Sequence, residues 1–157
     1  MSGVLKILSL VALVVGALAV GACGGADERE ERNAYVRELN AAQQEFADEA
    51  SLVSQQRSPA SIGQYRRTLQ RFEATIARFT RKLQKIEVPD EVRAEHAQLI
   101  AALKRFGLDF KRVTAALQNP NPRKLSEAKR AIAIATERAN LRIEAAAAAI
   151  DSKLERG

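Results

Sequence analysis

Apolar side chains recur along most of the chain at alternating steps of three and four residues, which is the spacing of one helix face. No stretch of useful length alternates apolar and polar residues with the period of two that is typical of strands. The pattern therefore predicts an all-α protein. The positions expected to be buried are Tyr35, Leu39, Ala42, Phe46 and Val53; Ile62, Tyr65, Leu69, Phe72, Ile76, Phe79, Leu83 and Ile86; Val92, His96, Leu99, Leu103, Phe106, Phe110, Val113 and Leu117; and Leu125, Ala128, Ile132, Ala135, Ala139, Ile143, Ala146 and Ile150.

Proline marks three breaks in this helical pattern. Proline suits the first turn of a helix and disfavours helix in the residue before it. Because the four segments are of similar length and the connections are short, we expect an antiparallel up-down-up-down four-helix bundle with coiled-coil-like packing. Both ends of the bundle chain then lie beside the middle connection. The breaks are Ser58-Pro59, Val88-Pro89 and Asn119-Pro120-Asn121-Pro122, and the predicted helices span about 27–57, 59–87, 89–118 and 122–155.

The first 26 residues differ from the rest of the chain. Lys6 precedes a stretch from Ile7 to Ala26 that contains no charged residue, and most of this stretch is aliphatic. A positive charge followed by an aliphatic run that ends in small residues is typical of a signal peptide.

The run ends in Val20-Gly21-Ala22-Cys23, which resembles the lipobox of bacterial lipoproteins. In that family an aliphatic residue stands three places before the cysteine, and two small residues fit the peptidase cleft. The resemblance implies that residues 1–22 are removed and that Cys23, now N-terminal, carries diacylglyceryl and acyl groups such as palmitate. It also implies a protein held by its lipid at the extracytoplasmic face of the cell membrane, with residues 23–26 as a short linker.

Two other interpretations of the N-terminus remain open. An uncharged span of 20 residues is long enough to cross a bilayer as an uncleaved helix, although its glycines weaken that interpretation. The segment is alternatively a plain secretory signal in which Cys23 is incidental. That interpretation leaves a reactive thiol on an exported protein.

The composition excludes several classes of chemistry. The 157 residues include one Cys and one His, so neither a disulfide framework nor a Cys/His zinc site is available. The Glu-x-x-His pairs of di-iron bundles and the Cys-x-x-Cys-His motif of c-type haem proteins are absent. We expect no metal, no cofactor beyond the acyl groups on Cys23, and no enzymatic activity.

Charge is distributed unevenly along a chain whose net charge is +6. Residues 27–57 hold 4 basic and 8 acidic residues, whereas residues 58–89 hold 7 basic and 2 acidic residues. In the second predicted helix, basic residues recur every seven positions and share one outward face. We call this set the basic stripe; it consists of Arg67, Arg71, Arg78, Arg81 and Lys85.

Two interpretations of the basic stripe are open. It is either a surface that binds an anion, such as a lipid head group, a cell-wall polymer or an acidic protein, or a solvated face. In the second case it pairs with Glu31, Glu38 and Glu45, which also recur every seven residues. Nucleic acid is not expected as a partner, because no aromatic side chains are interleaved with the basic ones.

His96 stands at a position of the third predicted helix where aliphatic residues are expected. Tyr35 lies at a similar depth in the first helix, so the two side chains are expected to meet in one polar layer of the core. The layer is either a hydrogen-bonded structural pair or part of a site that senses a ligand or a proton.

The helical part also resembles small helical-bundle lipoproteins of bacteria with Ala- and Arg-rich proteomes. The likeness lies in the composition, the helix count and the Val88-Pro89-Asp90-Glu91 break, and it implies no active site. We therefore expect a membrane-anchored, non-enzymatic interaction module of the cell envelope. The alternative is a carrier or sensor that holds a small apolar ligand in the core near Tyr35 and His96. The sequence leaves the partner and the oligomeric state open.

Overall fold

A computed structural model describes residues 25–55, 61–119 and 121–156. In these residues the chain forms four α-helices and one short 3-10 helix, and no strand. The protein is an all-α four-helix bundle, as the hydrophobic pattern predicts. The elements are α2 (Ala26–Ser54), α3 (Ile62–Leu83), η1 (Asp90–Val92), α4 (Arg93–Ala116) and α5 (Pro122–Leu154).

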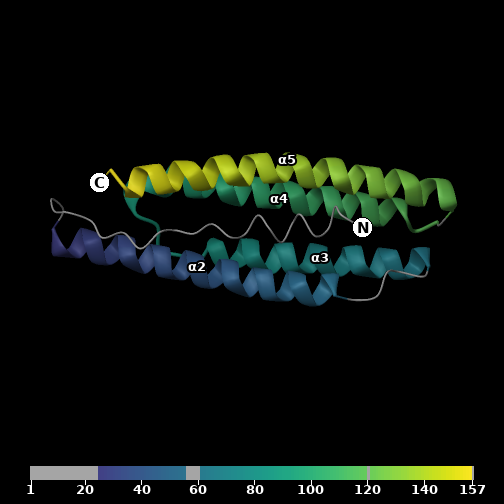
Figure 1. Cartoon of the computed structure of the whole chain (residues 1–157), viewed down its shortest axis with the longest axis horizontal. Coiled ribbons are helices and arrows are strands. Elements are labelled where there is room, and N and C mark those ends of the chain that lie inside the picture. The colour runs from purple at the N-terminus through teal and green to yellow at the C-terminus, as the bar shows by residue number, and fades with distance from the viewer. Residues whose placement is uncertain (1–24, 56–60, 120, 157) are drawn as a thin grey trace.

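The helices run up, down, up and down around a common core (Figure 1). Each packs against its neighbour in sequence, α2 on α3, α3 on α4 and α4 on α5, and the α4–α5 contact is the most extensive. The start of α2, the connection between α3 and α4, and the end of α5 lie together at one end of the bundle. We call this end the base.

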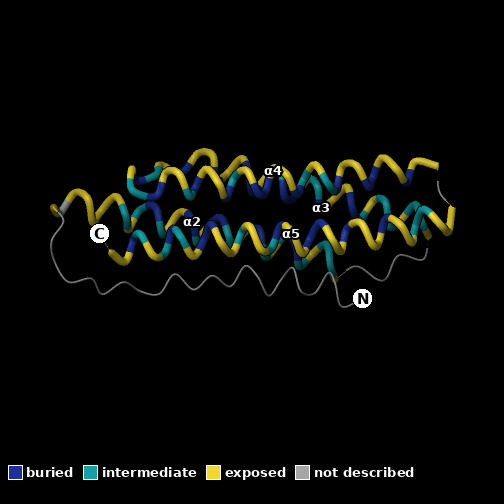
Figure 2. Tube along the Cα trace, turned by 90° about the horizontal axis from the view of Figure 1, so that it is seen from above, coloured by how far each residue is buried: buried dark blue, intermediate teal, exposed yellow. Residues whose placement is uncertain are grey.

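Most of the positions predicted to be buried are buried, and they form a stripe along the inside of each helix (Figure 2). Five of them sit at the margin of the core and are only half-buried, mostly near the end opposite the base. Ala50 and Leu154 are buried as well, beyond the predicted set. The half-buried five are Val53, Ile62, Tyr65, Leu125 and Ile143.

The second helix is shorter than the predicted span of 59–87. It begins at Ile62, where the backbone N–H of Gln64 donates to Ser61 Oγ at 3.2 Å, a hydroxyl N-cap that the proline rule did not identify. It ends at Leu83, where the backbone N–H of Ile86 donates to the Leu83 carbonyl at 3.2 Å. This i to i−3 bond tightens the last turn and ends the helix before the proline that was expected to end it.

The other boundaries differ less from the prediction. α2 ends at Ser54 rather than near 57, and the third helix begins as the 3-10 turn η1 after Pro89 before α4 starts. α5 starts at Pro122 as predicted, with Asn121 Oδ1 accepting from the backbone N–H of Lys124 at 2.8 Å.

The predicted signal peptide, residues 1–22, and Cys23 lie outside the described residues, as does the Ser58-Pro59 break. Within the described part of the chain, no helix combines the length and the apolar character that crossing a bilayer requires.

Candidate functional site

A buried hydrogen-bonded trio joins three helices near the base. The Tyr35 hydroxyl of α2 lies 3.0 Å from His96 Nδ1 of α4, and His96 Nε2 lies 3.0 Å from the Leu83 carbonyl oxygen of α3. Tyr35 and His96 are 1% and 4% exposed. The structure confirms the predicted meeting of Tyr35 and His96, and it adds the Leu83 carbonyl, which side-chain patterns cannot reveal.

The Leu83 carbonyl fixes the protonation of the imidazole. A carbonyl only accepts, so Nε2 carries the hydrogen and donates it, which leaves Nδ1 to accept from the Tyr35 hydroxyl. Burial lowers the pKa of His96, and the hydrogen bond to Leu83 opposes this in part. Burial, with the nearby carboxylates of Asp151 and Glu95, raises the pKa of Tyr35. Both side chains are therefore neutral near pH 7, and all their polar atoms are paired.

Ion pairs close the base around this trio. Lys153 Nζ of α5 lies 2.9 Å from Glu95 Oε1 and donates to the Glu91 carbonyl oxygen at 2.9 Å. Arg32 Nε of α2 lies 2.8 Å from Glu91 Oε1. The hydrogen bond from Lys153 lowers the pKa of Glu95, and burial raises that of Asp151. The base is therefore held together by paired charges as well as by apolar packing.

The basic stripe lies on α3 and its last residue follows the end of that helix, so we call it the α3 stripe from here on. All five of its residues are exposed, but only Arg78 forms an ion pair within the described chain. Arg78 forms a hydrogen-bonded ion pair with Glu49 of α2. Its Nε lies 3.1 and 3.0 Å from the two carboxylate oxygens, and its Nη2 lies 2.6 Å from Oε2. The hydrogen bonds between the two side chains lower the pKa of Glu49 and raise that of Arg78. The other four residues form no ion pair with any residue that the structure describes.

The expected partners of the stripe need correction. Of the three predicted glutamates only Glu45 pairs with α3, and its partner is Lys82, one turn beyond Arg78. Arg78 forms its ion pair with Glu49 instead. Heptad spacing placed the acidic and basic faces on the right helices, but the rotation of α2 against α3 selects the individual partners. Spacing alone does not supply that rotation.

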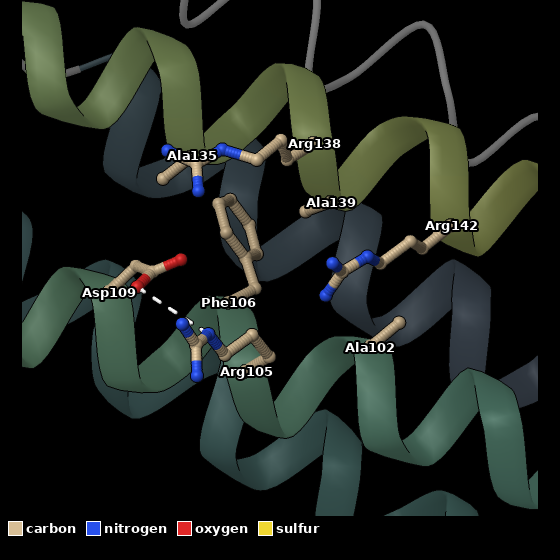
Figure 3. A pocket seen from close by; sticks show the side chains of 8 residues that line it. All are labelled: Ala102, Arg105, Phe106, Asp109, Ala135, Arg138, Ala139 and Arg142. Carbon is tan, nitrogen blue, oxygen red and sulfur yellow. Dashed lines mark ion pairs between the residues drawn. The ribbon is translucent and has the colours of Figure 1, made fainter.

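A groove runs between α4 and α5 on the outer surface (Figure 3). Its floor is Phe106 with alanines from both helices, and its rim holds Arg105 and Asp109 of α4 and Arg138 and Arg142 of α5. We call this feature the arginine groove. The apolar spacing did not predict this groove. The signal in the sequence was two arginines four residues apart on α5, next to alanines that leave the space open.

The arginine groove is small, with a volume of about 30 Å³. That is room for a water molecule or a few ligand atoms, whereas pockets that enclose a drug-sized ligand have volumes above roughly 300 Å³. It also lies away from Tyr35 and His96, where the carrier hypothesis expected space. Among the described residues, no cluster of three or more His, Cys, Asp or Glu side chains is arranged to hold a metal ion.

Comparison of the chain with protein-family models, with curated proteins and with solved structures found no match.

Proposed function

We propose that the protein is a lipid-anchored, extracytoplasmic interaction module that presents a rigid helical bundle to an anionic partner in the cell envelope. The lipobox-like Val20-Gly21-Ala22-Cys23 supports the anchor. Cys23 stands three residues before α2, whose first turn lies at the base. An acyl group on Cys23 holds the base near the bilayer and directs the opposite end of the bundle away from it.

The interaction role is supported mainly by the exposed and largely unpaired cations of the α3 stripe. Arg67, Arg71, Arg81 and Lys85 are exposed, and no carboxylate among the described residues pairs with them. Arg78 is held by Glu49, so it contributes charge but fewer free donors. Four unpaired cations on one face of a single helix favour an anionic partner, because each gains an ion pair without losing one.

Placing a photoreactive amino acid on the α3 stripe tests this role. Ala74 is exposed and lies between the stripe residues on the same face of α3. The matched control position is Ala133, which is exposed on α5 and lies away from the face that carries Arg138 and Arg142. In cells of the native host we expect a discrete crosslinked species from position 74 and none from position 133.

Charge reversal then shows whether the crosslink depends on the stripe. The double substitution Arg71→Glu and Lys85→Glu should abolish the crosslink from position 74 without changing the helical circular dichroism. The control Lys124→Glu with Arg130→Glu reverses the same number of charges on α5 and should leave the crosslink in place. Equal crosslinking in the two double variants, or no crosslink from position 74 at all, would contradict the proposal.

A further inference from the structure

The arginine groove carries a net positive charge that the protein itself does not neutralise. Asp109 is the one carboxylate in its lining, and it lies 3.9 Å from Arg105 and 3.5 Å from Arg112, both on α4. Arg138 and Arg142 on the opposite rim make no ion pair with any residue that the structure describes. Three guanidinium groups therefore border the groove, and one already shared carboxylate faces them (Figure 3).

The groove exists because small side chains face each other across the α4–α5 contact. Ala102 of α4 and Ala135 and Ala139 of α5 are buried beside Phe106, and none of them reaches far enough to fill the space between the two helices. The arginine side chains border this space and leave an apolar floor beneath it (Figure 3). A ligand atom in the groove meets guanidinium donors at its sides and the aromatic side chain of Phe106 below.

Apolar side chains of unusual exposure flank the same groove. Leu108, Ile134 and Leu141 are 49%, 42% and 63% exposed, and they are three of the four large exposed hydrophobic residues in the described chain. Each directly precedes a residue of the groove, so it sits about 100° further round its helix on the outward side. An apolar surface thus continues outward from the charged rim. Single exposed aliphatic side chains are ordinary, but three around one basic groove are not.

We infer that the arginine groove binds an anionic amphiphile, a phosphate or carboxylate head group attached to an apolar chain. The head group takes hydrogen bonds from Arg105, Arg138 and Arg142, since guanidinium forks match the geometry of both oxyanions. A volume of about 30 Å³ admits the head-group oxygens only. The apolar chain of the ligand therefore lies over the protein surface, against Leu141 and Leu108. This site is separate from the α3 stripe and does not depend on the lipid anchor.

Protection of individual arginines from phenylglyoxal, which modifies guanidinium groups, tests this inference. The full chain is kept in dodecyl maltoside and treated with phenylglyoxal in the presence of dodecyl phosphate, inorganic phosphate or dodecanol. The modified arginines are then located by mass spectrometry. We expect dodecyl phosphate to slow modification of Arg105, Arg138 and Arg142 at least about fivefold, while exposed Arg130 and Arg156 react unchanged. Dodecanol and inorganic phosphate at the same concentration should protect none of them.

Two variants separate the charged and apolar contributions. Arg138→Gln with Arg142→Gln should weaken dodecyl phosphate binding about tenfold or more, read from the protection of Arg105. Leu141→Ser should weaken it about threefold to tenfold through the lost apolar contact. The matched control, Arg130→Gln with Arg156→Gln, removes two charges from the same helix and its C-terminal turn and should leave the protection of Arg105 intact.

A second arm identifies the source of the amphiphile. The chain is placed in phosphatidylcholine vesicles with or without phosphatidylglycerol. Protection that requires phosphatidylglycerol indicates a bilayer lipid, whereas protection by dodecyl phosphate in detergent alone indicates a dispersed amphiphile, and both agree with the inference. It is overturned if neither dodecyl phosphate nor phosphatidylglycerol protects any of the three arginines, if inorganic phosphate protects them equally, or if Arg130 and Arg156 are protected to the same degree.

Discussion

His96 of α4 donates the hydrogen on Nε2 to the carbonyl oxygen of Leu83, the last residue of α3, across 3.0 Å. The final carbonyls of a helix lack partners within the helix, so this imidazole acts as a cap supplied by a neighbouring helix. Its other nitrogen accepts from Tyr35 of α2. One side chain therefore fixes the relative positions of three helices at the base.

Replacing His96 should cost more than one hydrogen bond. In His96→Leu the Tyr35 hydroxyl and the Leu83 carbonyl both stay buried, and each loses its bond to the imidazole. We expect a loss of about 2 to 4 kcal/mol in the free energy of unfolding, measured by denaturant titration. Tyr35→Phe removes only the hydroxyl and should cost about 1 to 2 kcal/mol. A loss below about 1 kcal/mol for His96→Leu would show that the cap does not stabilise the bundle.

The pKa of His96 predicts the pH dependence of stability. Because burial lowers this pKa in the folded state, the unfolded chain binds the proton more tightly. The contribution of neutral His96 is complete above about pH 6.5, the usual imidazole pKa, and is lost as the pH falls below it. Unfolding measured from pH 7.5 to 5 should show this decline, and His96→Gln should remove it. A decline of the same size in His96→Gln would show that groups other than His96 cause it.

The Arg78–Glu49 pair should matter little for stability in spite of its geometry. Both side chains are partly exposed, at 51% and 30%, and exposed pairs contribute roughly 0 to 1 kcal/mol. We expect Arg78→Gln to lower the free energy of unfolding by less than about 1 kcal/mol. The difference should shrink further in about 1 M salt, since salt screens exposed charges. A larger loss of unfolding free energy that persists in salt would show that the pair contributes substantially to the packing of α2 on α3.

Gly107 offers a substitution that should stabilise the bundle. It lies in the interior of α4, and a Cβ built there meets Ile76 Cγ2 at 3.6 Å, an ordinary van der Waals distance. Because glycine costs about 0.5 to 1 kcal/mol relative to alanine inside a helix, Gly107→Ala should raise the free energy of unfolding by that amount. A decrease in the thermal midpoint would mean that α4 and α3 approach more closely at this point than the 3.6 Å contact indicates.

The sequence predicted the bundle well because the fold depends on features that spacing records directly. Leu83 and Phe110 are buried where the steps of three and four placed them. The Tyr35–His96 pair was predictable because two polar residues at equal depth in antiparallel helices have few other partners. The end of α3 was misjudged, because i to i−3 bonds and a capping imidazole end it before Pro89.

The surface sites were less predictable, because they depend on how the helices are rotated. The partner of Arg78 is Glu49 and not a member of the acidic heptad series, a choice made by the α2–α3 rotation. The arginine groove joins residues of α4 and α5 that lie about 30 positions apart in sequence. Charge spacing within one helix carries no information about such a pairing.

The intact mass of the protein, extracted in mild detergent from the membranes of its native host, tests the proposed lipid anchor most directly. We expect a protein that lacks residues 1–22 and begins at Cys23, heavier than the corresponding peptide by a diacylglyceryl group and, where the amine is also modified, by one further acyl chain. A mass that still includes residues 1–22 and no added lipid would contradict the lipid anchor.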